Sequence, residues 1–208
     1  MQDTPLARAA ATVSFTLNGR PTTVSAPAFA SLADTLREEL GLAGTKIGCE
    51  AGDCGACTIR LDGEQVCACL VATAQADGAR VDTVEGADPT TDRLRAAFLA
   101  RGAAQCGICT PGMLMAATDL LARNSGPSRS EVEDAIGGVL CRCTGYLQIV
   151  EAILDLSAGS GASAGSDPSA QRRRSTHRFG EGSDPVPDPV PWGSDPVTTS
   201  RIASTISR

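Results

Sequence analysis

The sequence predicts an α+β protein with a β-rich region at residues 11–86 and a helical region at residues 87–157. Apolar residues of the first region alternate with polar ones, as in half-buried strands, whereas beyond Thr91 they recur at helical spacing. After Ser157 the composition changes to glycine, serine and proline, and Gly-Ser-Asp-Pro occurs three times. Such a segment buries too little apolar surface to offset the entropy lost on ordering. Residues 158–208 are therefore expected to form a low-complexity disordered tail.

The β-rich region is expected to open with a hairpin and a helix. Thr12 to Leu17 alternates, Asn18-Gly19 is a strong two-residue turn signal, and Thr22 to Ser25 continues as a second strand. A helix then begins at Ser31, carries leucines at every fourth position, and ends at Gly41. Further strands are expected at Thr58–Leu61, after the Asp62-Gly63 turn on a segment returning to Cys69, and at Arg80–Val84.

The second region is expected to contain four helices. Their expected bounds are Thr91 to about Arg101, Thr110 to Leu121, Ser130 to Leu140 and Tyr146 to Leu156. Thr110-Pro111 is typical of an N-cap followed by proline at the first helical position. Ser130-Glu131-Val132-Glu133 has the spacing of a capping box. Their apolar stripes predict a helical core.

Eight of the nine cysteines fall into two quartets. The first consists of Cys49, Cys54, Cys57 and Cys69, and the second of Cys106, Cys109, Cys141 and Cys143. Four thiolates are what one iron–sulfur cluster needs. One chain is thus predicted to carry two redox centres, as in an electron relay.

The first quartet opens with the C-x4-C-x2-C run of plant-type [2Fe–2S] ferredoxins. Glycines in the loop at residues 44–57 let amide N–H groups approach cluster sulfurs. With the expected strands, this loop predicts a β-grasp, plant-ferredoxin-like domain. Zinc also takes four cysteines, but usually through paired short-spaced motifs, whereas three ligands here share one loop.

The second quartet lies beside expected helix ends. Cys109 immediately precedes one helix and Cys143 lies just before another. An anionic cluster there gains from exposed N–H groups and the positive ends of the helix dipoles. Spacing alone does not bring the two cysteine pairs together, but a four-helix bundle with antiparallel neighbours does so.

Composition limits other functions. The sequence has no apolar run long enough to span a bilayer and does not begin like a signal peptide, so a cytoplasmic location without membrane insertion is expected. In that reducing compartment, cysteines serve as metal ligands or catalysts rather than in disulfides. The single histidine, His177, lies in the tail, which leaves no imidazole for acid–base catalysis in the folded part.

Charge argues against a nucleic-acid partner. Residues 1–157 carry 12 basic and 19 acidic side chains, a net charge of −7, whereas the tail carries +1. The tail's Arg172-Arg173-Arg174 triplet is interpreted as a solvated charge run.

Four motifs together resemble the iron–sulfur small subunit of the xanthine oxidase family of molybdenum hydroxylases. They are GCEAGDCGACT (48–58), CL (69–70), QCGICTPG (105–112) and CRCTGY (141–146). They occur in the family's order, and the resemblance covers about residues 11 to 156.

The resemblance implies an electron-transfer subunit that is not catalytic by itself. In such enzymes a large subunit binds molybdenum on a pyranopterin and oxidises the substrate, or carbon monoxide in one branch. Electrons then pass through both [2Fe–2S] clusters to FAD on a medium subunit. By resemblance Cys106, Cys109, Cys141 and Cys143 hold the molybdenum-proximal cluster, and Cys49, Cys54, Cys57 and Cys69 the flavin-proximal one. Gln105 matches the glutamine that hydrogen-bonds the pterin.

Two features depart from the family's pattern. Cys67 is an extra thiol two residues before Cys69, on the same face of a strand if this stretch is one. Cys69 is favoured as the ligand because the family places its ligand before a leucine. The tail extends beyond the family's usual end.

Two other classes of function stay open. A stand-alone two-cluster ferredoxin would carry electrons between diffusing partners, although such a carrier has no pterin for Gln105 to bind. A zinc-stabilised interaction module would be colourless. The substrate cannot be predicted, because its pocket would lie on another chain.

Overall fold

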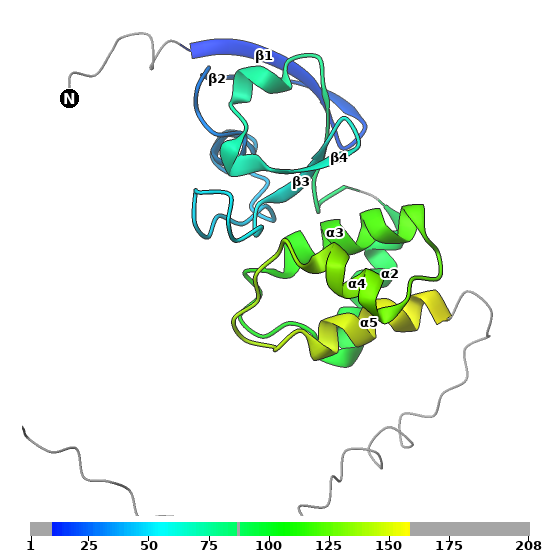
Figure 1. Cartoon of the computed structure of the whole chain (residues 1–208). Helices are drawn as coiled ribbons and strands as arrows, with labels where there is room; N and C mark the ends of the chain where they lie inside the picture. Colours follow the sequence, from blue (N-terminus) through cyan, green and yellow to red (C-terminus); the bar gives the residue numbers. More distant parts are fainter. Residues whose placement is uncertain (1–9, 87, 159–208) are drawn as a thin grey trace, which may run out of the picture. The chain divides into compact units, whose positions relative to one another are not determined.

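The computed structural model describes residues 10–86 and 88–158, which lie in one compact unit of the chain. Figure 1 shows the strands in the earlier part of the chain and four helices in the later part, coloured green to yellow. The mixed sheet and the helices confirm the predicted α+β class. Apart from Ala158, the predicted tail at residues 158–208 lies outside the described residues.

One five-stranded sheet forms the first region. Its strands are β1 (Ala10–Leu17), β2 (Arg20–Pro27), β3 (Thr58–Leu61), β4 (Glu64–Cys67) and β5 (Arg80–Asp82). The order across the sheet is β2-β1-β5-β3-β4. β1 and β5 pair in parallel, and all other neighbours are antiparallel. The last strand therefore lies at the middle of the sheet and joins its two hairpins.

Both predicted hairpin turns are confirmed. Asn18 and Gly19 have φ of +50° and +79°, and Asp62 and Gly63 have φ of +52° and +91°. A two-residue turn with positive φ at both positions matches the twist of the flanking strands, and asparagine, aspartate and glycine tolerate it best. β1 and β2 extend beyond their predicted bounds because backbone pairing continues to Ala10 and Pro27.

The predicted helix after Ser31 begins and ends where the sequence indicates. The Ser31 side chain accepts a hydrogen bond from the Asp34 N–H and caps α1 (Leu32–Asp34), which continues as the wider π-helical turn η2 (Thr35–Glu39). Gly41 follows with φ of +69°. The wider turn leaves Leu32 and Leu36 fully buried, whereas Leu40 is only half-buried.

The first region has its own apolar core. Side chains from the sheet, α1, η2 and the short 3-10 turns pack together in it, including Val13, Phe15, Leu36, Ile59 and Val81. Cys57 belongs to this core, so one predicted ligand is anchored in the packing beneath the loop.

Four helices form the second region. They are α2 (Pro89–Arg101), α3 (Thr110–Arg123), α4 (Arg129–Ile136) and α5 (Leu147–Ala158). α2 packs on α3 and α5, and α4 also contacts α3 and α5. Their shared core includes Leu94, Met113, Ile136, Ile149 and Ile153. No helix within residues 10–86 and 88–158 is long and apolar enough to cross a membrane.

Several helix boundaries differ from the predicted ones. α2 begins at Pro89, because the Asp88 side chain accepts hydrogen bonds from the N–H groups of Thr90 and Thr91. The N-cap of α3 is Cys109, which places Thr110 inside the first turn. Thr91 was therefore wrong as the start of α2, and Thr110 was wrong as an N-cap, since it is the first residue of α3.

The capping box of α4 is formed by Ser128 and Glu131, and the predicted start at Ser130 was wrong. Both serines are followed three positions later by a glutamate, so the sequence offers two overlapping boxes. Glu133, the glutamate of the second box, instead forms an ion pair with Arg129 at 3.6 Å. α4 ends at Ile136, before the predicted Leu140, because Gly137 caps it.

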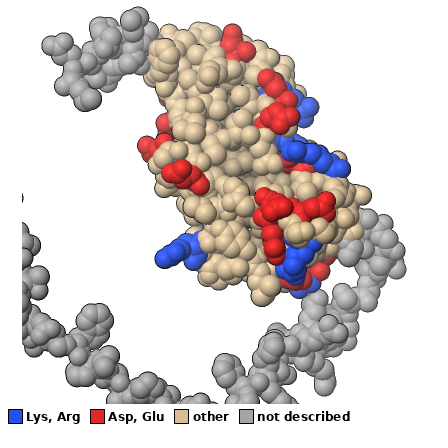
Figure 2. Space-filling view, viewed as in Figure 1, with Lys and Arg blue, Asp and Glu red and all other residues tan. Residues whose placement is uncertain are grey.

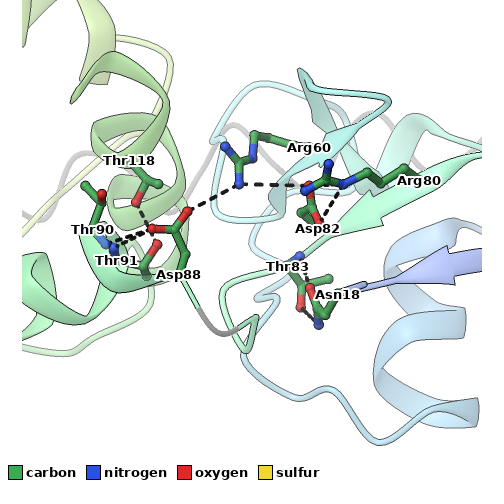
Figure 3. Close-up of polar contacts among 9 residues, drawn as sticks. All are labelled: Asn18, Arg60, Arg80, Asp82, Thr83, Asp88, Thr90, Thr91 and Thr118. Atoms are coloured by element: carbon green, nitrogen blue, oxygen red, sulfur yellow. Dashed lines mark hydrogen bonds and ion pairs between the residues drawn. The ribbon is translucent and has the colours of Figure 1, made fainter. Parts of the chain in front are cut away.

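Polar contacts connect the sheet with the start of α2 (Figure 3). The Arg60 guanidinium on β3 lies 3.9 Å from the carboxylate of Asp82 and 3.7 Å from that of Asp88. The Asn18 amide bonds both the hydroxyl and the N–H of Thr83. These contacts tie the turn of the first hairpin to Thr83, just after β5, and tie the N-cap of α2 to β3.

Candidate cluster-binding sites

Cys49, Cys54 and Cys57 lie in the loop between η2 and β3. Gly52 and Gly55 have φ of +81° and +66°, so the loop curls in a conformation that glycine adopts without a Cβ clash. Cys49 is exposed and Cys57 is buried. The loop therefore presents sulfur atoms from its outer edge inward to the core.

Amide groups of this loop point at the Cys49 sulfur. The N–H groups of Ala51 and Cys54 donate to it, each with an N···S distance of 3.4 Å. The hydrogen bond from Ala51, followed by those from Cys54, lowers the pKa of Cys49 to about 7. Hydrogen bonds to the charged form favour a thiolate, which is the form that binds metal.

The thiols of the first quartet lie close enough to influence one another's pKa. The Cys54 side chain adds to the lowering of the pKa of Cys49. Burial raises the pKa of Cys57, and hydrogen bonding with Cys69 partly offsets it, while Cys57 also acts on the thiol of Cys67. Neighbouring cysteines suit a [2Fe–2S] cluster, whose two irons share four cysteine ligands.

Cys67 also lies at this site. It ends β4 opposite Thr58, whereas Cys69 lies on the 3-10 turn Ala68–Leu70. Because the strand ends at Cys67, the two cysteines do not lie on the same face of one strand. Burial is the main cause that raises the pKa of both thiols, that of Cys69 to about 11.

Gly52 distinguishes these two cysteines. Its N–H is hydrogen-bonded to the Cys69 sulfur, whereas its carbonyl oxygen accepts a hydrogen bond from the Cys67 thiol at 3.5 Å. A cluster ligand is a thiolate and has no proton to donate, so the contact of Cys67 with a carbonyl suits a protonated thiol.

The second quartet is brought together from two distant segments. Cys106 and Cys109 precede α3, and Cys141 and Cys143 lie between α4 and α5. The Sγ atoms of Cys106 and Cys143 are 3.5 Å apart, and Cys109 and Cys141 each shift the pKa of the other. Cys106 and Cys143 are exposed, whereas Cys109 and Cys141 lie deeper.

The loop after α4 orients Cys141. Its N–H donates to the Tyr146 hydroxyl at 2.8 Å, and its sulfur lies 3.0 Å from the Thr144 hydroxyl. Gly145 and Tyr146 both have positive φ, which closes the loop. Burial raises the pKa of Cys141, but hydrogen bonds from Thr144 and from the Cys143 N–H outweigh it and leave that pKa lowered.

Depth separates the other two sulfurs of this quartet. Burial is the main cause that raises the pKa of Cys109 to about 12. The Ile108 N–H lowers the pKa of the exposed Cys106. Burial thus disfavours the thiolate of Cys109, whereas a backbone amide favours the thiolate of Cys106.

Two further observations bear on what the second quartet can hold. The Thr110 hydroxyl, next to Cys109, is buried and has no hydrogen-bond partner among the described residues. Within residues 10–86 and 88–158, no three side chains of the metal-binding types converge as on a single ion. A free donor beside paired thiols fits a dinuclear cluster, whose sulfides accept hydrogen bonds.

Gln105 lies in the bend between α2 and α3, next to the first cysteine of the second quartet. Both Gln105 and Cys106 are exposed, and Ile108 is 49% exposed. The predicted pterin contact therefore lies on an accessible surface beside the exposed thiol pair.

Three residues inside the quoted motifs shape these sites in ways that the motifs did not indicate. The Gly52 carbonyl oxygen accepts a hydrogen bond from the Cys67 thiol. The hydroxyl groups of Thr144 and Tyr146 contact the sulfur and the N–H of Cys141, respectively. The Thr-Gly-Tyr run after Cys143 was a usable signal, because threonine and glycine favour tight loops. No local signal identified the role of Gly52.

Comparisons with known proteins agree with this geometry. Residues 15–89 match the family model of the 2Fe-2S iron-sulfur cluster binding domain, and residues 83–154 that of the [2Fe-2S] binding domain. The chain is 51% identical to the nicotine 6-hydroxylase small subunit of Paenarthrobacter nicotinovorans over 140 residues, 67% of this chain and 85% of the relative. It is 40% identical to the xanthine dehydrogenase iron-sulfur-binding subunit of Escherichia coli O157:H7, over 69% of this chain and 92% of the relative.

A solved structure supports the same relationship. A chain of quinoline 2-oxidoreductase from Pseudomonas putida 86 aligns with a TM-score of 0.68 and 44% identity, covering 73% of this chain and 95% of that chain. Two [2Fe–2S] domains in succession define an electron-transferring iron–sulfur protein. The chain belongs to the iron–sulfur small subunits of the xanthine oxidase family of molybdenum hydroxylases, and so to an oxidoreductase complex.

Proposed function

We propose that this subunit relays electrons from a molybdopterin centre on a large subunit to FAD on a medium subunit. The observation that carries the proposal is the gathering of cysteines from separate segments at two sites of one compact unit. The Sγ atoms of Cys106 and Cys143 lie 3.5 Å apart, and two loop amides donate to the Cys49 sulfur. A bound [2Fe–2S] cluster supplies a one-electron carrier, and this chain supplies its ligands and hydrogen bonds.

The proposed ligands divide between the two sites. Cys106, Cys109, Cys141 and Cys143 hold the molybdenum-proximal cluster, and Cys49, Cys54, Cys57 and Cys69 hold the flavin-proximal one. We assign Cys69 rather than Cys67 because Gly52 offers its N–H to Cys69 and its carbonyl to Cys67. Cys67 is then a neighbouring thiol that stays protonated.

The large subunit is proposed to cover the surface around Gln105. There Gln105, Cys106 and Cys143 are exposed, and the exposed apolar side chains Ile108 and Leu147 neighbour them in sequence. Exposed apolar side chains beside polar ones are typical of a protein–protein interface. Gln105 donates its amide to the pterin in this proposal.

Several finer expectations belong to the same proposal. The first domain, residues 11–86, is a β-grasp, and the second, residues 87–157, is a four-helix bundle. The tail at residues 158–208 contributes no ligand. The complex is cytoplasmic and binds neither nucleic acid nor the membrane interior. On the face in Figure 2, acidic side chains lie beside basic ones and no broad basic patch is visible.

The test is purification of the native protein under nitrogen, with iron, acid-labile sulfide, zinc, molybdenum and FAD measured. We expect four irons and four sulfides per chain, because each cluster holds two of each, together with two larger partner subunits. Near-stoichiometric zinc without iron would contradict the proposal. Isolation of an iron-loaded chain without molybdenum, FAD or partners would instead support a stand-alone carrier.

The partner surface is tested with Gln105→Ala in the assembled complex. We expect slower reduction of the clusters by substrate, or weaker assembly, while the spectrum of the ferredoxin-type cluster is unchanged. Loss of one buried interfacial hydrogen bond costs about 1–3 kcal/mol. Truncation after Ser157 is the control, since the tail is proposed to lie outside the redox path.

A further inference from the structure

The two cluster-binding sites meet through their backbones. Three glycines make this contact, which we call the glycine seam: Gly55 in the first loop, Gly112 in the first turn of α3, and Gly138 after α4. Gly55 follows Cys54 directly, Gly112 follows Cys109 by three residues, and Gly138 precedes Cys141 by three. The seam therefore joins the ligand-bearing segments of both sites.

The contact leaves no room for a side chain. A Cβ on Gly112 would overlap the carbonyl oxygen of Gly55 and lie 3.1 Å from Val139 Cγ1. A Cβ on Gly55 would overlap the carbonyl oxygen of Gly138 and lie 2.9 Å from Val139 Cα. The nearest obstacle in each case is a backbone atom, which cannot rotate away as a side chain can. Only glycine permits this close approach.

Hydrogen bonds hold the seam closed. The Leu140 N–H donates to the Cys54 carbonyl oxygen at 2.9 Å. Nearby, the Gln65 side-chain amide of β4 donates to the carboxylate of Asp119 on α3, at 2.5 Å. Asp119 is buried and also accepts from Arg123 of its own helix. Because a buried carboxylate is costly without partners, the bond to Gln65 resists separation of β4 from α3.

We propose that the glycine seam is a positioning device, which holds the two cluster-bearing backbones at their closest approach and thereby sets the electronic coupling between the two centres. This rests on the proposed relay. An exchange across the seam moves one electron, which oxidises the molybdenum-proximal centre and reduces the flavin-proximal one. No bond or proton changes place. The electron originates from substrate oxidised on the large subunit.

The test compares Gly112→Ala with Gly138→Ala in the assembled complex. Gly112 is helical and alanine is the better helix former, so this substitution removes only the room for close approach. A Cβ on Gly138 would meet nothing within 4 Å, which makes Gly138→Ala the matched control within the same seam. The readout is the low-temperature electron paramagnetic resonance spectrum of the dithionite-reduced complex, in which two nearby reduced clusters split each other's signals.

We expect the splitting to narrow or vanish in Gly112→Ala and to match the wild type in Gly138→Ala. Iron and sulfide per chain are measured in each variant, so a wild type without iron would contradict the proposed relay rather than this inference. Full clusters with unchanged splitting in Gly112→Ala would overturn the inference. If Gly112→Ala does not assemble, Gln65→Ala loosens the same contact without added bulk. Narrowed splitting there supports the seam, and unchanged splitting overturns it.

Discussion

The two cluster-binding sites are both built from cysteines, but the first takes most of them from one loop and the second takes them from two distant segments. In the first site, three cysteines share the loop between η2 and β3, and amides of the same loop donate to the Cys49 sulfur. In the second site, Cys106 meets Cys143 across 37 positions of sequence, because the helices between them pack. The first site depends mainly on local backbone conformation and the second on tertiary structure.

This difference has an energetic consequence. Closing a longer loop costs more entropy, and the second quartet forms only if the long segment between Cys109 and Cys141 is closed. Cys109 is also buried with a raised pKa, so the second site combines a more distant pairing with a less available thiolate. The metal should therefore contribute more to the folding of the helical region than to that of the sheet.

Removal of the metal is expected to separate the stabilities of the two regions most strongly. Metal binding to a structural site supplies folding free energy on the order of 10 kcal/mol. After anaerobic chelation we expect amides of α3, α4 and α5 to lose hydrogen-exchange protection first, while those of the β1–β2 hairpin keep theirs. Mass spectrometry of exchanged peptides measures both regions in one sample. Equal loss in both would refute the difference between the sites.

Ligand substitution sharpens the comparison within the first site. Cys69→Ser is expected to remove or alter the resonance of the ferredoxin-type cluster, whereas Cys67→Ser keeps both clusters' resonances, because Gly52 offers its N–H to Cys69 alone. Electron paramagnetic resonance of the reduced protein distinguishes the two variants. The reverse pattern would make Cys67 the ligand.

Core truncations test whether each region stands on its own packing. Leu36 and Ile153 are fully buried in the first and second core, and replacement of either by alanine is expected to cost about 2–5 kcal/mol. Exchange protection should fall most in the region that carries the substitution. Leu99→Ala is the control, because Leu99 is 83% exposed and its truncation should change stability by about 0.5 kcal/mol or less. A uniform loss across both regions would mean that they unfold as one unit.

The smallest expected effect concerns pH at α4. Hydrogen bonds from the N–H and hydroxyl of Ser128 hold the pKa of Glu131 below its usual value of 4.5. A carboxyl whose folded pKa is lowered stabilises the fold above its unfolded pKa, and this stabilisation is lost as pH falls below about 4.5. Thermal melts of the wild type and Glu131→Gln should therefore differ at pH 7 and converge toward acid pH. A constant difference would exclude the ionised capping box.

Local chemistry was predictable from the sequence. Asn18-Gly19 and Asp62-Gly63 are short-range turn signals, and the structure has both turns at those positions. The two quartets were read from cysteine spacing, and as ligand sets they stay predictions. Ser130 failed as a cap because Ser128 heads an identical spacing two residues earlier, and propensity does not distinguish the two.

Tertiary contacts were beyond the sequence patterns. The wide turn at Thr35–Glu39 and the glycine seam depend on what lies opposite each residue. Gly112 reads as an unfavourable residue inside a helix, and only the nearby carbonyl of Gly55 explains it. Cys67 and Cys69 differ through the two sides of the Gly52 peptide, which no spacing reveals.

The glycine seam also limits how this chain can be divided. A cut near residue 86 would leave the Cys54 carbonyl without the Leu140 amide, and it would uncover the backbone at Gly55 and Gly112, which have no side chains of their own. Unpaired backbone groups on a bare surface invite pairing with foreign chains. Either half grafted alone into another protein would lose this partner. The two regions together are therefore the smallest portable unit for engineering.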